Sequence, residues 1–193
     1  MSSSNLIRWC GMAAVVAGVL SIAVDLVVLA VFGFGQSLGE ALTSSGLLFR
    51  SAAAPLAGAL LLLGLVGLYA RQSETTGVPG LVSFLVAFVG TVLAQSFVLA
   101  DLLANLGWAL FGVSCLRARI YPRVASTLLI IGAVSTAVFS SLPRSEAGGV
   151  LMYAVISSDV ILNLAIAWLG LALFTRSRGE GLRQASLGSG GGD

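Results

Sequence analysis

The stretch GVPGLVSFLVAFVGTVLAQSFVLADLLANLGWALFGVSCL, residues 77–116, decides the fold, because Asp101 is the only charged residue in it. A helix rises about 1.5 Å per residue, so this stretch as one helix would run roughly 60 Å. The hydrocarbon core of a bilayer is only about 30 Å thick. The stretch therefore predicts two membrane spans, with the chain reversing near Asp101 to Asn105.

The composition of the whole chain agrees with a membrane protein. Of its 193 residues, 58% are hydrophobic and 9% are charged, and the mean hydropathy is +1.03. A soluble domain carries about a quarter charged residues, so this chain has too few to cover a water-facing surface. Disordered chains are poor in apolar residues, which excludes them as well. We therefore expect an integral membrane protein of one small domain.

The residue types that are missing exclude several kinds of site. The chain has no His, and all ten of its basic residues are Arg. The lack of His excludes bis-His haem, an HExxH zinc site and a Ser–His pair, and the lack of Lys excludes a retinal Schiff base and a P-loop. Cys10 and Cys115 are isolated thiols, so no metal and no cofactor are expected. The net charge of +2 is too small to suggest a nucleic-acid partner.

The apolar runs along the chain predict an all-α, polytopic transmembrane helix bundle with six spans. A span needs about 20 predominantly apolar residues. The predicted spans are residues 9–34, 49–70, 79–100, 102–118, 124–141 and 150–175. They form one transmembrane domain, residues 1–176. Residues 177–193 are rich in Gly and Ser and predict a flexible cytoplasmic tail.

The arginines predict the orientation of the bundle. Basic residues in short loops remain on the cytoplasmic side. With six spans and a cytoplasmic N-terminus, Arg50 and Arg144 fall outside and the other eight arginines fall inside. Those eight are Arg8, Arg71, Arg117, Arg119, Arg123, Arg176, Arg178 and Arg183. We therefore expect both termini in the cytoplasm, and the inner (plasma) membrane of the cell as the location.

Four ionisable residues lie within or beside the predicted spans: Asp25, Arg50, Asp101 and Asp159. Such groups are costly in the bilayer and usually face the protein interior, where they have a partner or a role. Counted along the helices from the nearest cytoplasmic arginine, the three aspartates lie about 24–25 Å above that face, and Arg50 lies about 31 Å above it. All four therefore belong to the outer part of the membrane.

Two asparagines accompany the aspartates. Asn105 and Asn163 lie one turn from Asp101 and Asp159, and each pair shares a helix face. Gln95 lies at a similar depth in the third span. One interpretation is an outward-opening polar pocket formed by Asp25, Arg50, Asp101, Asp159, Asn105 and Asn163. Three acids facing one base cannot all be ionised cheaply, so such a pocket would suit a proton or a cation.

A structural interpretation of the same residues stands beside this one. Arg50 can snorkel to the outer headgroups or pair with an aspartate simply to hold helices together. Asp101 can be a solvated residue at the turn, and the asparagines can form interhelical hydrogen bonds. The sequence leaves both interpretations open.

Two segments also resemble known sequences. LVGLYARQ, residues 65–72, and LGWALFGVSCLRARIYPRVASTLLIIGA, residues 106–133, are similar to segments that recur in small bacterial multi-pass membrane proteins of unassigned function. The resemblance covers roughly residues 61–134. It implies the membrane topology and brings no activity, cofactor or binding residue.

The sequence is compatible with three functions. Small size, short loops and the lack of a catalytic set favour a non-enzymatic accessory component of the membrane, in contact with the bilayer and with a protein partner or a second copy of the chain. The alternative is a small proton- or cation-linked transporter or channel that uses the outer Asp/Arg pocket. An intramembrane lipid-modifying enzyme is the weakest hypothesis, because the sequence has no DDxxD-like cluster.

Overall fold

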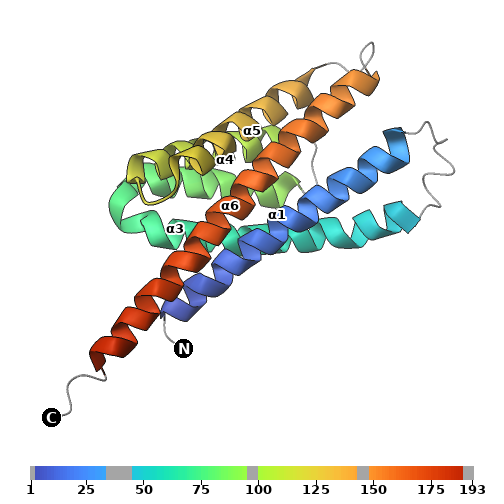
Figure 1. Ribbon diagram of the computed structural model, residues 1–193. Helices are drawn as coiled ribbons and strands as arrows, with labels where there is room; N and C mark the ends of the chain where they lie inside the picture. Colours follow the sequence, from blue (N-terminus) through green and yellow to red (C-terminus); the bar gives the residue numbers. More distant parts are fainter. Residues whose placement is uncertain (1–2, 34–44, 95–99, 143–147, 189–193) are drawn as a thin grey trace.

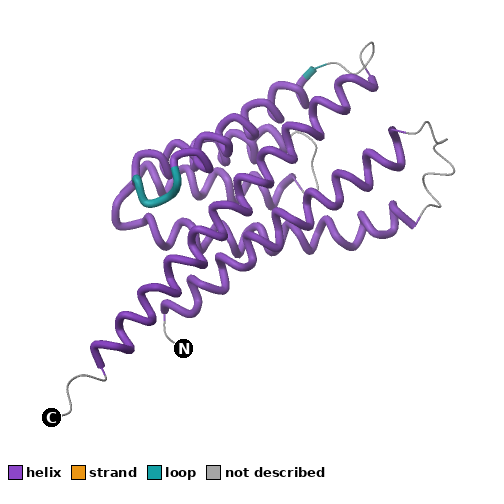
Figure 2. The backbone as a smooth tube through the Cα atoms, in the orientation of Figure 1, coloured by secondary structure: helices purple, strands orange, loops and turns teal. Residues whose placement is uncertain are grey.

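The computed structural model describes residues 3–33, 45–94, 100–142 and 148–188, and almost all of them are helical. The fold is all-α, as the sequence predicts (Figure 1). Figure 2 shows the short connection at residues 119–122, where two helices are joined at one end of the molecule. The helices are α1 (Ser3–Gly33), α3 (Ser45–Ala94), α4 (Ala100–Ala118), α5 (Arg123–Ser141) and α6 (Gly148–Gly188).

The long helix α3 is two helices that meet at Gly77. Gly77 has φ 55° and ψ −144°, which interrupts the helical backbone. A positive φ strains any residue with a Cβ, so glycine suits this position. The chain then turns back on itself (Figure 1), and the ring of Tyr69 before the break stacks on Phe84 after it, with centroids 4.5 Å apart. The first limb, residues 45–76, and the second, residues 78–94, therefore run side by side.

The connection between the third and fourth expected spans does not include Asp101 to Asn105, where the sequence predicts it. The sequence places Asp101 and Asn105 at the turn, but both lie inside α4, which begins at Ala100. The physical reason is that an acidic residue in the first turn of a helix interacts favourably with the helix dipole. Asp101 therefore marks the start of a helix and not the connection before it. Gln95 lies outside the described residues.

Four of the described helices are long and apolar enough to cross a membrane. Their candidate spans are Asn5–Ala30, Leu48–Ala94, Arg123–Ser141 and Val150–Arg176. α4 is not among them, because Asp101, Asn105 and Arg117 lower the hydropathy of its nineteen residues. Large apolar side chains are exposed on the outer faces of the helices, as expected of a surface that contacts lipid.

The helices close into a ring. α1 packs against α6 and α3, α4 packs against α3 and α5, and α5 packs against α6. Glycine brings two of these pairs together: a Cβ at Gly18 of α1 would lie 2.5 Å from the Asn163 carbonyl oxygen of α6, and one at Gly107 of α4 would lie 2.3 Å from the Ala87 nitrogen of α3. Small residues let membrane helices approach closely, because little side-chain bulk separates the backbones.

A layer of buried apolar side chains lies inside the ring, toward the end of the bundle where the arginines gather. Each of these side chains lies about two turns from an arginine that the sequence assigns to the cytoplasmic side, or roughly 9–10 Å along its helix. We refer to this layer as the apolar plug. Its members are Leu65, Phe111, Leu129 and Leu169, all of them fully buried.

The helix α6 continues to Gly188, through most of the segment for which the composition predicts a flexible tail. Leu182, Arg183, Gln184 and Ala185 favour helix, which offsets the glycines around them. The cytoplasmic position and the flexibility of this segment stay predictions.

Candidate functional site

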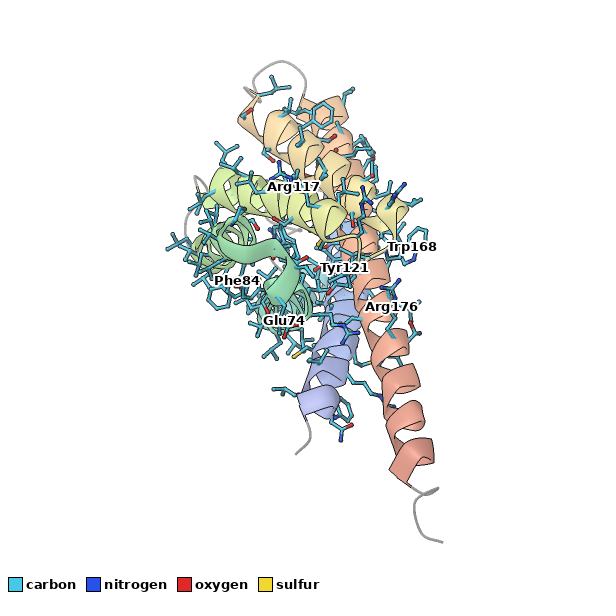
Figure 3. The ribbon with its side chains drawn as sticks, turned by 90° about the vertical axis from the view of Figure 1, so that its left-hand side faces the viewer. Glu74, Phe84, Arg117, Tyr121, Trp168 and Arg176 are labelled. Atoms are coloured by element: carbon cyan, nitrogen blue, oxygen red, sulfur yellow. The ribbon has the colours of Figure 1, made fainter. Side chains whose placement is uncertain are left out.

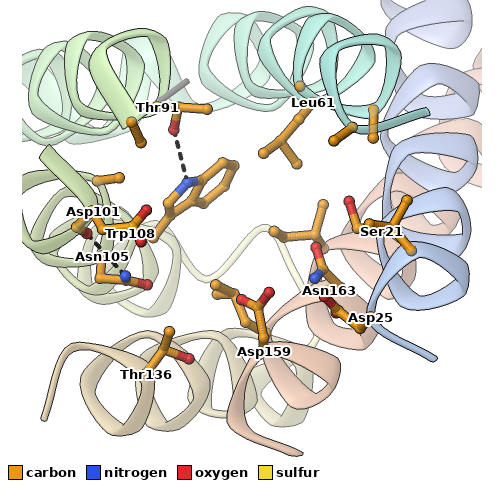
Figure 4. Close-up of a pocket in the computed structure, with 18 of the residues that line it drawn as sticks. Ser21, Asp25, Leu61, Thr91, Asp101, Asn105, Trp108, Thr136, Asp159 and Asn163 are labelled. Carbon is orange, nitrogen blue, oxygen red and sulfur yellow. Dashed lines mark hydrogen bonds between the residues drawn. The ribbon is translucent and has the colours of Figure 1, made fainter. Parts of the chain in front are cut away.

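A cavity of about 280 Å³ lies inside the ring and receives residues from all five helices (Figure 4). Asp25 comes from α1, Asp101 from α4 and Asp159 from α6, so three carboxyl groups from three helices share it. Asn105 and Asn163 line it as well. We call it the acidic cavity. Five of the six residues predicted from the sequence thus come together, although they are up to 138 positions apart in the chain.

The predicted arginine occupies a different position. Arg50 is exposed near the start of α3 and does not line the acidic cavity. Its charge nevertheless interacts with the carboxylate of Asp25. It therefore acts on the site as a nearby positive charge and not as a ligand-facing side chain, because the first turns of α3 lie beyond the lined volume.

Asp159 is the electrostatic centre of the cavity. Its charge interacts with Asp25 on one side and with Asp101 on the other. The side chain of Asn163 is a hydrogen-bonding neighbour of Asp25, which connects α6 to α1. Like charges in surroundings of low dielectric repel one another, so the arrangement favours a bound proton or cation that lowers the net negative charge.

Asp101 and Asn105 line the cavity from α4. The Asn105 amide nitrogen Nδ2 donates a hydrogen bond of 2.9 Å to the backbone carbonyl of Asp101 (Figure 4). Asp101 is exposed, and Asn105 is buried. This side-chain-to-backbone bond uses one of the two Nδ2 protons within the same helix, so the interhelical hydrogen bond that the structural interpretation expects stays a prediction.

Two polar atoms of the cavity lack a hydrogen-bond partner among the described protein atoms. One is the carboxylate oxygen Oδ2 of Asp25, and the other is the hydroxyl Oγ1 of Thr136 in α5. Thr136 is 6% exposed and lines the cavity. A buried polar group without a partner costs about 1–3 kcal/mol, so these atoms are ready to bind a ligand or a water.

Trp108 and Thr91 are lining residues that the sequence patterns above do not single out. The indole Nε1 of Trp108 donates a hydrogen bond of 3.1 Å to Thr91 Oγ1, which joins α4 to the second limb of α3 (Figure 4). Trp108 follows Asn105 by three positions and Asp101 by seven, so it lies on the same face of α4. That spacing is a signal which the sequence carries. Thr91 and Thr136 show no comparable signal, because single hydroxyl residues are common in membrane helices.

The described side chains do not form a metal site of ordinary geometry. Across the described ranges, no three Asp, Glu or Cys side chains gather closely enough to hold one metal ion. The three aspartates therefore surround a space and do not converge on a point. This is consistent with an occupant larger than a bare metal ion, or with protons carried by separate carboxyl groups.

A second polar region lies at the end of the bundle where the arginines gather. Tyr121 donates a hydrogen bond of 2.9 Å from its hydroxyl to the Leu68 carbonyl, and burial raises the pKa of Tyr121, which keeps this donor protonated. Arg176 donates to the Ile120 carbonyl. Figure 3 looks onto this end, where Tyr121, Arg176 and the α3 turn that carries Glu74 all face the viewer. These bonds tie the α4–α5 connection to α3 and α6.

Arginines expected on the cytoplasmic side meet at this same end. Arg8 of α1 lies over the ring of Phe174 of α6, 4.9 Å from its centroid. The Tyr121 hydroxyl also interacts electrostatically with the charges of Arg71 and Arg176. The apolar plug lies between this end and the acidic cavity. The two polar regions are therefore separated by a layer of buried apolar side chains.

Comparison with known proteins adds no family to this description. No family model, no curated protein and no solved structure matches the chain. The geometry of the acidic cavity is therefore the basis for a function.

Proposed function

We propose that the protein crosses the inner membrane of a bacterial cell six times, with both ends in the cytoplasm. The two limbs of α3 support this, because the break at Gly77 divides its length into two segments. With α1, α5 and α6 these segments make five spans, and α4, nineteen residues long, would be the sixth. The gathering of Arg8, Arg71 and Arg176 at one end supports the orientation. In this topology the acidic cavity lies in the outer half of the membrane and the apolar plug in the inner half.

Within that topology the protein is a small proton- or cation-linked transporter. The observation that carries this proposal is the convergence of Asp25, Asp101 and Asp159 from three helices on one cavity. Ionisable residues inside membrane bundles often mark ion pathways and proton relays, because their desolvation is costly and they are rare without a partner or a role. A plug of buried side chains below the cavity favours a carrier over an open channel, since a channel needs a continuous polar path.

The acidic cavity gives less support to the other two functions that the sequence allows. An accessory component or a homo-oligomer needs no buried carboxyl groups, and no described surface identifies its partner. Both stay predictions. A lipid-modifying enzyme would use one carboxyl group as an acid and one as a base on a bound lipid. A cavity of about 280 Å³ is small for a lipid chain.

Proton flux into liposomes tests the proposal. Purified protein is reconstituted with a pH-sensitive dye inside the vesicles, and a pH gradient is imposed in the presence of Na⁺ or K⁺. Asp159→Asn should abolish the protein-dependent flux, because the central carboxyl group then neither binds a proton nor attracts a cation. Asp25→Asn should lower it at least tenfold. The control is Glu74→Gln, which removes the same charge at an exposed position away from the cavity.

Unchanged flux in both aspartate variants would refute the proposal. Each variant is first shown to be monodisperse by gel filtration, so that a loss of flux is not a loss of folding. Flux that is equally lost in Glu74→Gln would also count against a role specific to the cavity.

A further inference from the structure

The size of the acidic cavity points to an occupant larger than a proton. Its volume is about 280 Å³, whereas one water needs roughly 10–15 Å³. Pockets for small molecules begin at about 300 Å³, so the acidic cavity falls at their lower end. The three aspartates do not form a metal site, as described above. A small organic molecule matches this volume better than a bare ion does.

The lining of the cavity changes along the bundle axis. Asp25, Asp101 and Asp159 lie about 24–25 Å from the arginine end along their helices. The side chains of Leu61, Trp108 and Ile166 lie only about 14–15 Å from it, by the same count. The cavity therefore has an acidic outer part and an apolar inner part, which we call the aromatic floor. Figure 4 shows the Trp108 ring facing the space that Asp159 and Asn163 face from α6.

Trp108 is held in place for contact with a ligand. Its indole nitrogen is bonded to Thr91, and its ring packs edge-on against Phe111, with an interplanar angle of 83°. Among the described residues, the arginine that lies over an aromatic ring is Arg8, over Phe174 at the opposite end. Among aromatic side chains, the face of an indole attracts cations best. The floor therefore offers a fixed apolar surface of small area, because Trp108 is 3% and Ile166 1% exposed, and the indole also favours positive charge.

Unpartnered polar atoms supply a second, independent sign of a ligand. Thr136 is more than nine-tenths buried, lines the cavity and has a hydroxyl without a protein partner, and Asp25 Oδ2 is unpartnered too. By the same count, Thr136 lies about 20 Å from the arginine end, between the aromatic floor and the aspartates, and Asp25 lies on the outer side. A ligand with a positive head and an apolar body would meet polar atoms with the head and Trp108 with the body.

We propose that the acidic cavity binds a small organic ammonium ion, with the ammonium between Asp25 and Asp159 and its alkyl groups on the aromatic floor. This inference rests on the cation-binding role proposed above and names the class of cation. Association needs no covalent step. The ammonium charge offsets one of the two carboxylates, and Arg50 also acts on Asp25 as a nearby positive charge. Trp108 favours a soft, weakly hydrated cation over Na⁺ or K⁺ because its face cannot replace the water that those ions lose.

Fluorescence of Trp108 provides the test. The chain has three tryptophans, and Trp9 and Trp168 are exposed on the outer faces of their helices. In a Trp9→Phe/Trp168→Phe background, Trp108 is the sole reporter. Tetraethylammonium chloride is titrated against this protein in detergent, with NaCl exchanged to keep the ionic strength constant. A saturable change in emission is expected, and Asp159→Asn should abolish it. The neutral alcohol 3-ethyl-3-pentanol, of similar shape, should cause none.

A matched pair of floor variants tests the aromatic contact. Trp108→Phe and Trp108→Leu both lose the hydrogen bond to Thr91, but only phenylalanine keeps an aromatic face. Equilibrium dialysis with radiolabelled tetraethylammonium should show binding that is about tenfold weaker in Trp108→Leu and within about threefold of the wild type in Trp108→Phe. If the leucine variant does not fold, the titration of Trp108 with and without Asp159→Asn still decides.

The outcomes separate this inference from the transporter proposal. Flux that depends on Asp159, together with no saturable tetraethylammonium binding, would overturn the organic ammonium and leave a proton or inorganic cation as the cargo. Binding that survives Asp159→Asn, or that is equally strong for the neutral alcohol, would overturn it as well. Equal, undiminished affinity in both floor variants would overturn the role of Trp108. Flux and binding that are both independent of Asp159 would refute the two proposals together.

Discussion

A single added methyl group at Gly18 should separate α1 from α6 and open the acidic cavity. In Gly18→Ala the new Cβ would lie 2.5 Å from the Asn163 carbonyl oxygen and 2.9 Å from the Ala167 Cβ. The first distance is about 0.9 Å shorter than the 3.4 Å at which ordinary contacts begin. Backbone atoms cannot rotate away, so the two helices must move apart. Overpacking of this kind lowers the free energy of unfolding by about 1–3 kcal/mol.

The same displacement affects the site, because Asp25 lies two turns along α1 from Gly18 and contacts Asn163 across the same interface. Unfolding by SDS in mixed micelles measures the stability, and tetraethylammonium binding to Trp108 measures the cavity. The control is Val19→Ile, which adds one methylene to the next residue on the exposed face. Gly18→Ala with the stability and the affinity of Val19→Ile would refute the close approach of α1 and α6.

Two further predictions concern the arginine end of the bundle and the topology. Tyr121→Phe removes the hydrogen bond to the Leu68 carbonyl and should lower the free energy of unfolding by about 1 kcal/mol in the same SDS assay, whereas the exposed Tyr153→Phe should change nothing. In a cysteine-free background, a membrane-impermeant maleimide applied to intact cells should label Ser141→Cys but not Ser73→Cys. The reverse pattern would refute the proposed orientation.

The fold class could be predicted from the sequence because the bilayer restricts which residues can lie in a membrane span. Runs of about 20 apolar residues are stable in lipid only as helices, since every backbone group must be bonded within the protein. Residues 77–116 already imply a reversal, because their length exceeds the bilayer twofold. The predicted place of that reversal is wrong, since Asp101 begins a helix and does not lie in the turn. Charge alone does not separate a loop from a first helical turn.

The candidate site could be predicted to a useful degree from spacing. Asp101 with Asn105, and Asp159 with Asn163, are each four residues apart and reach the same cavity. Their partners across the bundle follow only from the general expectation that costly polar groups meet inside. Trp108 extends the first pair by three residues, but tryptophan is ordinary in a membrane helix and does not stand out. Arg50 lies outside the cavity because the first turns of α3 extend beyond it, which agrees with its count of about 31 Å against about 24–25 Å for the aspartates.

The sequence by itself therefore determined what the bilayer selects. These features are the helical fold class, the apolar runs along the chain, and a short set of polar residues that lipid does not tolerate. What only the tertiary structure decided is which helices are neighbours, and hence which aspartates share one cavity. The physical reason is that these helices are apolar on all sides. Lipid and protein core are equally apolar, so hydrophobic periodicity does not distinguish the inner face from the outer. Contacts such as that of Gly18 with Asn163 determine which face of each helix points inward, and these contacts form only when the helices pack.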